Sequence, residues 1–156
     1  MPPRALTPQQ QLIWRAAFAL GLVLALVGAG DAAGQWIPLR VGTPEWELGT
    51  VTYFFDTVPL LLIGVTLLVG SGVALGRRWQ VRTMAILCIL LAVLMWLAAV
   101  LFGTVVPLAL RGMRDPVGLT MLKKSLVKTG VQVALYPFAL LWLAAASWRA
   151  SRRTAA

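Results

Sequence analysis

The sequence predicts an all-α membrane protein with four transmembrane helices and with short interfacial helices in the first and third loops. Of its 156 residues, 60% are hydrophobic and only 12% are charged, whereas about 25% of the residues of a soluble domain are charged. A globule of this size cannot bury that much apolar surface. Four apolar runs approach the roughly 20 residues that a helix needs to cross a bilayer, and no alternating barrel pattern is present.

The predicted elements form a single transmembrane domain over residues 1–156. The expected spans cover residues 16–33, 58–76, 83–110 and 130–148. The third span contains Gly103 and Pro107 near its end, so it is either one long tilted helix or a helix that breaks near these two residues.

Helix-start signals in the first and third loops predict the interfacial helices, over about residues 44–55 and 115–128. Thr43-Pro44-Glu45 combines an N-cap residue, a proline at the first helical position and an acid in the first turn. Asp115-Pro116 repeats the pattern. Asp56 precedes Thr57-Val58-Pro59 and is expected to be a second N-cap, at the start of the second span.

The basic residues predict the topology, because loops on the cytoplasmic side carry an excess of Lys and Arg. One side holds both termini and the loop between the second and third spans, with no acidic residue; its basic residues are Arg4, Arg15, Arg77, Arg78, Arg82, Arg149, Arg152 and Arg153. The other side holds fewer basic residues and all five acidic ones. We therefore expect both termini to be cytoplasmic, in a bacterial inner membrane, with anionic lipids as partners.

The composition excludes most catalytic chemistry. The chain has no His and one Cys, Cys88, so His-ligated haem, His-based zinc sites and Ser-His-Asp or Cys-His catalysis are excluded. The acids are too dispersed for a carboxylate metal cage. The net charge of +9 lies beside apolar spans rather than on a basic-aromatic surface, so we expect no nucleic-acid partner. We expect neither an enzyme nor a cofactor of the chain's own.

Two acids leave a transport function open. Asp31 and Asp56 lie within or beside spans, where carboxylates can relay protons or bind cations. Both are expected near the membrane interface rather than at its midplane, where a carrier would need them.

Small residues and aromatics are the candidate packing surfaces. Pairs of small residues four apart let helices approach closely in lipid, and large aromatics dominate interface energetics. These candidates are Gly30, Gly34, Gly72, Gly76, Ala99 and Gly103, together with Trp96 and Trp142 near mid-span. Packing within the bundle accounts for any single pair, while contact with a partner helix, a carotenoid or a quinone is the alternative.

One stretch of the chain resembles the HpsJ-like family, small four-span membrane proteins named for hormogonium polysaccharide and found mainly in cyanobacteria. The residues that carry the resemblance are Pro44, Trp46, Glu47, Asp56, Pro59 and Gly64. The family has a longer Gln-rich segment between spans three and four, which this chain lacks. The resemblance implies the four-span architecture and a phototroph or surface-polysaccharide context, but no reaction.

Taken together, these features predict a non-catalytic accessory or scaffold subunit of a larger bacterial membrane complex. The expected partners are other integral membrane subunits and lipids. The host is either an energy-converting or photosynthetic complex or a polysaccharide export system, and a small proton-coupled transporter that uses Asp31 or Asp56 is the alternative.

Overall fold

The computed structural model describes residues 6–37, 40, 42–112 and 116–153, and every regular element in these ranges is an α-helix. The helices are α1 (Pro8–Gly34), α2 (Pro44–Ala74), α3 (Arg78–Gly112) and α4 (Pro116–Arg153). Each contains a stretch long and apolar enough to cross a membrane, which confirms the predicted fold class and makes the chain a multi-pass membrane protein.

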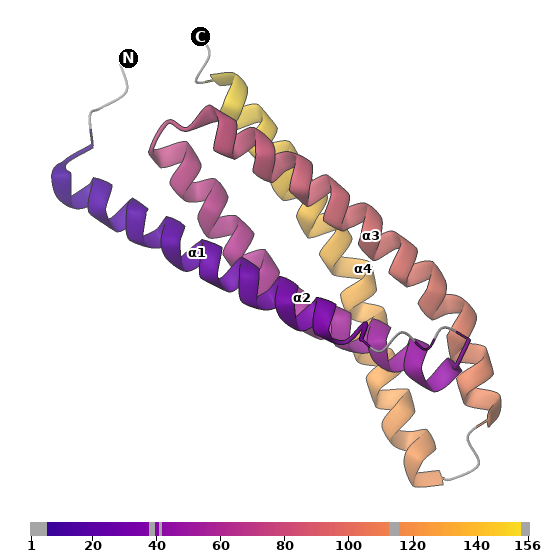
Figure 1. Cartoon of the computed structure of the whole chain (residues 1–156). Helices are drawn as coiled ribbons and strands as arrows, with labels where there is room; N and C mark the ends of the chain where they lie inside the picture. Colours follow the sequence, from indigo (N-terminus) through magenta and orange to yellow (C-terminus); the bar gives the residue numbers. More distant parts are fainter. Residues whose placement is uncertain (1–5, 38–39, 41, 113–115, 154–156) are drawn as a thin grey trace.

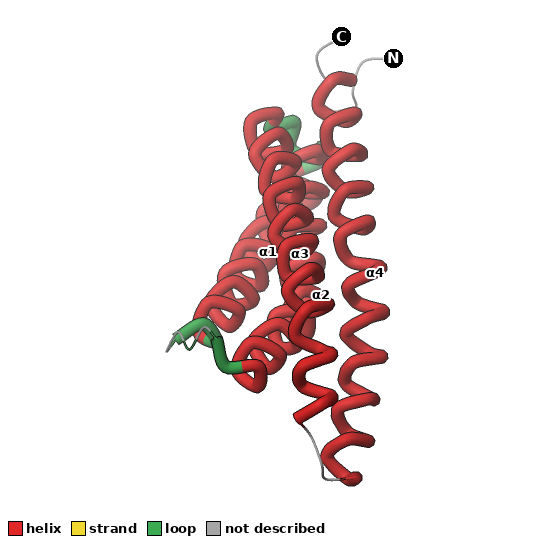
Figure 2. The backbone as a smooth tube through the Cα atoms, turned by 90° about the vertical axis from the view of Figure 1, so that its right-hand side faces the viewer, coloured by secondary structure: helices red, strands yellow, loops and turns green. Residues whose placement is uncertain are grey.

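Helix α2 is the central element of the bundle (Figures 1 and 2). It packs against α1, α3 and α4, and α3 packs against α4 along most of its length. Among the described residues, α1 contacts α2 alone. Helix α1 begins and α4 ends at the same end of the bundle (Figure 2). This agrees with a chain that crosses the membrane four times, because an even number of crossings returns it to the side where it started.

Local sequence signals determine where α1 begins and where α2 ends. Thr7 and Gln10 form a capping box: the Gln10 amide N–H donates to Thr7 Oγ1 at 3.3 Å, and the Thr7 amide N–H donates to Gln10 Oε1 at 2.9 Å. At the end of α2, Gly76 adopts a φ of +66°, a left-handed conformation that glycine reaches without the Cβ penalty. The chain therefore turns within a few residues into α3.

The structure does not confirm separate interfacial helices. Residues 44–55 form the first turns of α2, and the described part of 115–128 forms the first turns of α4. Asp56 therefore lies inside α2, and its predicted role as an N-cap is wrong. Pro59 does not break α2, because membrane helices accommodate an interior proline. Asp115 lies outside the described residues.

Thr43 occupies the N-cap position of α2, as predicted, but its side chain does not make the capping hydrogen bond. Thr43 precedes the first residue of α2 in an extended conformation. Its hydroxyl instead donates to the Arg40 carbonyl at 2.7 Å. The neighbouring Glu47 accepts the Gly42 amide N–H at 2.9 Å, so a side chain of α2 still anchors the preceding loop.

Helix α3 is one continuous helix, which answers the question left open by Gly103 and Pro107. Both residues lie inside it, as Pro137 lies inside α4. The helices exceed the expected spans by several residues at most ends, because capping and packing extend helices beyond the apolar run that hydropathy detects.

Backbone contact between glycines joins α1 to α2. A Cβ atom added to Gly64 would lie 2.7 Å from the Ala25 amide nitrogen and 2.8 Å from the Gly21 carbonyl oxygen. One added to Gly21 would lie 2.8 Å from the Gly64 carbonyl oxygen, and one on Gly28 would lie 3.0 Å from Leu61 Cγ. The two backbones approach so closely that no side chain fits between them.

A buried glutamine joins α3 to the end of α2. The Gln80 side-chain amide donates to the Leu68 carbonyl at 2.7 Å and to Ser71 Oγ at 3.2 Å. Gly72 lies beside it, and an added Cβ would lie 3.0 Å from Val81 Cγ2. This contact holds the short α2–α3 turn in place.

The apolar core lies between α2, α3 and α4. Its buried members include Phe55, Val65, Cys88, Met95 and Leu140, with Phe55 fully enclosed. Helix α1 contributes Ala32 to this core, and its other buried residues are Gly21 and Gly28, which pack on α2.

Candidate functional site

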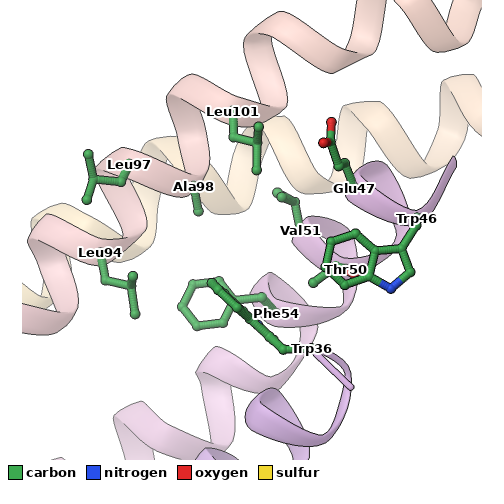
Figure 3. Close-up of a pocket in the computed structure, with 10 residues that line it drawn as sticks. All are labelled: Trp36, Trp46, Glu47, Thr50, Val51, Phe54, Leu94, Leu97, Ala98 and Leu101. Atoms are coloured by element: carbon green, nitrogen blue, oxygen red, sulfur yellow. The ribbon is translucent and has the colours of Figure 1, made fainter. Parts of the chain in front are cut away.

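A hollow between α1, α2 and α3 is a prominent concave feature among the described residues. Two adjoining cavities, of about 320 and 380 Å³, share Trp36, Phe54 and Leu94 as lining residues. Together they form one apolar groove along three helices. Figure 3 shows the first cavity, with Leu94, Leu97 and Leu101 of α3 facing Val51 and Phe54 of α2.

The groove becomes polar only at one end. There Trp46, Glu47 and Thr50 of α2 line it together with Trp36 (Figure 3). Tryptophan side chains favour the membrane interface, where one edge is apolar and the other can donate a hydrogen bond. The arrangement therefore has an apolar interior and an amphipathic mouth.

Small side chains on α1 create the second part of the groove. Ala29, Ala32 and Ala33 line it opposite Leu61 of α2 and Leu91 of α3. Because α1 packs on α2 and, among the described residues, does not reach α3, the space between α1 and α3 stays partly open. No charged group among the described residues lines this second part.

A second feature, a polar cluster, joins α2 to α4. Lys128 Nζ lies 2.8 Å from Asp56 Oδ1, and the Gln132 side-chain amide donates to the same oxygen at 3.1 Å. The Gln132 side chain is almost completely buried, whereas Asp56 and Lys128 are partly exposed. The cluster connects residues far apart in the sequence and holds the two helices in register.

The cluster lies close to the edge of the apolar region. At about 1.5 Å per residue, Asp56 is roughly 27 Å along α2 from Ala74, a distance close to the ~30 Å thickness of the hydrocarbon core. Asp31 is exposed near the end of α1, on a helix that, among the described residues, does not contact α4. The two acids singled out from the sequence therefore have different surroundings.

The small-residue pairs fall into two groups. Gly72 packs tightly against α3, and Gly76 forms the turn that follows. A Cβ atom added to Gly30, Gly34 or Gly103 would have nothing within 4 Å, so these helix faces point outward, and Ala99 is half-buried.

The two mid-span tryptophans both lie on the outer face of the α3–α4 pair. Trp96 makes an edge-to-face contact with Phe138, with ring centroids 5.9 Å apart. Trp142 is 74% exposed. Neither side chain belongs to the core, so both remain available for lipid or for another protein.

Several residues that carried the family resemblance belong to these features. Trp46 and Glu47 line the mouth of the groove, Gly64 forms the α1–α2 seam and Asp56 belongs to the polar cluster. Pro59 lies inside α2, and Pro44 is its first residue.

Sequence reasoning missed most of the groove and most of the cluster. It did not single out the groove residues Phe54 and Leu94, or Gln132, the buried partner of Asp56. It also did not identify Gly21 and Gly28 as packing positions, although a spacing of seven residues on α1 is a helical signal for one face.

The fold and the groove define a class of protein: a four-helix membrane bundle with a partly open apolar groove. Comparison with known protein families, with curated proteins and with solved structures gave no match.

Proposed function

We propose that this chain is a non-catalytic accessory subunit of a larger bacterial membrane complex, and that it holds a slender apolar tail in the groove between α1, α2 and α3. The observation that carries the proposal is the groove itself, with leucine, alanine and phenylalanine inside and Trp36 and Trp46 at its mouth. Lipid tails, carotenoids and quinone side chains share the required shape.

The apolar lining of the groove, with polar groups at one end only, favours an amphipathic molecule with an apolar tail. The two cavities hold about 320 and 380 Å³. An extended hydrocarbon chain fits this volume, and its polar end would meet Thr50 and the two tryptophans at the mouth.

Filling the groove tests this proposal. We expect Ala33→Phe, which adds bulk on the α1 wall, to deplete the lipid or isoprenoid that co-purifies with the protein, as measured by mass spectrometry of the extracted complex. Val27→Phe is the matched control, because Val27 is an exposed residue on α1 that does not line either cavity. Equal retention of the tail by both variants would contradict the proposal.

The accessory role predicts co-migration with partners. Extracted from its native membrane in mild detergent, the tagged chain should run on a native gel as part of a large, defined complex. Mass spectrometry of that band then names the host. The resemblance to the HpsJ-like family supports a phototrophic host, with an energy-converting complex and polysaccharide export as candidates. Migration as a monomer or small homo-oligomer would contradict the accessory role.

The charge distribution supports an inner-membrane orientation with both termini cytoplasmic. Arg77 in the α2–α3 turn and Arg78 and Arg82 at the start of α3 lie at the same end of the bundle as Arg149 and Arg152 at the end of α4. Arg78 lines a small crevice with Ala150 and Ser151. All five arginines are exposed. A group of exposed arginines at one end of a membrane bundle attracts the anionic headgroups of the cytoplasmic leaflet.

A further inference from the structure

Two buried oxygen atoms on α4, in the turn that carries Lys128 and Gln132, have no hydrogen-bond partner. They are Thr129 Oγ1 and Gln132 Oε1, in side chains of residues that are 0% and 8% exposed. Leaving a polar group without a partner in an apolar environment is costly. The polar cluster between α2 and α4 therefore has unused acceptor capacity.

The hydrogen bond to Asp56 fixes which way the glutamine points. Gln132 Nε2 donates to Asp56 Oδ1 at 3.1 Å, and the reversed amide would place an oxygen against the carboxylate. Gln132 Oε1 must then accept, because an amide oxygen has no proton to donate. A ligand for this position has to offer positive charge or a donated proton.

We propose that Asp56, Thr129 and Gln132 bind a monovalent metal cation, Na+ or K+, in exchange with the ammonium group of Lys128. Carboxylate, amide and hydroxyl oxygens are the ligands that hard cations take. The single carboxylate balances one positive charge. A divalent ion would leave an uncompensated charge at the edge of the hydrocarbon core, which is strongly disfavoured.

Lys128 is placed to act as the exchanging group. Its side chain is 59% exposed, and a lysine near the end of a membrane-spanning segment can extend its ammonium group to the interface while its stem stays on apolar surface. Replacing the ammonium by a metal cation leaves the net charge of the cluster unchanged. In the structure the ammonium group of Lys128 lies on Asp56, the position that the metal cation would take. This inference does not depend on the apolar groove or on the accessory role.

Thermal unfolding under cation exchange tests the inference. The full chain, in nanodiscs of neutral lipid, is heated at constant ionic strength while choline chloride is replaced by NaCl or by KCl. We expect the melting temperature to rise and saturate with one of the two salts, which identifies the ion, because a ligand that binds only the folded state stabilises it. Asp56→Asn should abolish the rise, and Thr129→Val should shift it to higher concentration.

The sign of the Lys128→Gln effect separates exchange from a purely structural ion pair. If the ammonium occupies Asp56 about 90% of the time, its removal lowers the half-saturating cation concentration about tenfold. Lys124→Gln is the matched control, because Lys124 carries the same charge one turn earlier on α4 and is exposed; it should leave the half-saturating concentration unchanged. The inference is overturned if the melting temperature of both the wild type and Lys128→Gln is the same in choline, sodium and potassium, or if Asp56→Asn keeps the cation response.

Discussion

Replacing Gly64 by alanine is expected to lower the free energy of unfolding by about 1–3 kcal/mol, the usual cost of inserting a carbon into a well-packed site. The added Cβ would meet backbone atoms of Ala25 and Gly21 at 2.7 and 2.8 Å. Backbone cannot rotate away as a side chain can, so α1 has to shift as a whole. Gly64→Leu should detach α1 from α2. The measurement is unfolding in mixed micelles titrated with a denaturing detergent.

Gly30→Ala is the matched control for this seam. Gly30 lies in the same helix pair, but nothing lies within 4 Å of a Cβ added there. Alanine is a better helix former than glycine by about 0.5–1 kcal/mol, so this variant should be neutral or slightly more stable. A Gly64→Ala protein as stable as Gly30→Ala would show that the α1–α2 seam is looser than described.

Replacing Phe55 by alanine is the second substitution with a large expected effect. Phe55 is 0% exposed and makes an edge-to-face contact with Phe54, with ring centroids 5.7 Å apart. Phe→Ala in a packed core costs about 3–5 kcal/mol, from lost contacts and the cavity that remains. We expect the lower end of this range, because lipid still surrounds the separated helices. The same detergent titration measures it.

Tyr53→Ala provides the comparison for Phe55. Tyr53 is an aromatic residue two positions earlier on α2 with an exposed side chain, and its truncation opens no interior cavity. The difference between the two variants then reports core packing rather than helix propensity. Similar losses from both would contradict the placement of the core between α2, α3 and α4.

The four helices could be predicted from the sequence because the signal is local. Each span is an apolar run, and the excess of hydrophobic residues leaves no soluble alternative. The error at Asp56 arose from local evidence as well. An acid followed by Thr57-Val58-Pro59 has the composition of a helix start, but the same residues fit inside a helix when a cation from α4 pairs with the acid.

The candidate site could be predicted only in part, because it depends on how helices pack. Asp56 was identifiable as an acid near a span. Its pairing with Lys128, however, joins positions that are separated by the rest of α2, all of α3 and the first turns of α4. The groove has no sequence signal of its own. It exists because α1 leans on α2 alone among the described residues, and a helix tilt is set by contacts that hydropathy does not contain.

The backbone-to-backbone seam also determines how this protein can diverge in evolution. Positions 21 and 64 admit only the smallest residue, whereas the outward positions of α1 need only remain apolar. Related chains are thus expected to share almost no identity along α1 apart from glycine at these seam positions. A search for distant relatives would gain most by giving that sparse pattern more weight than the many interchangeable leucines, valines and alanines around it.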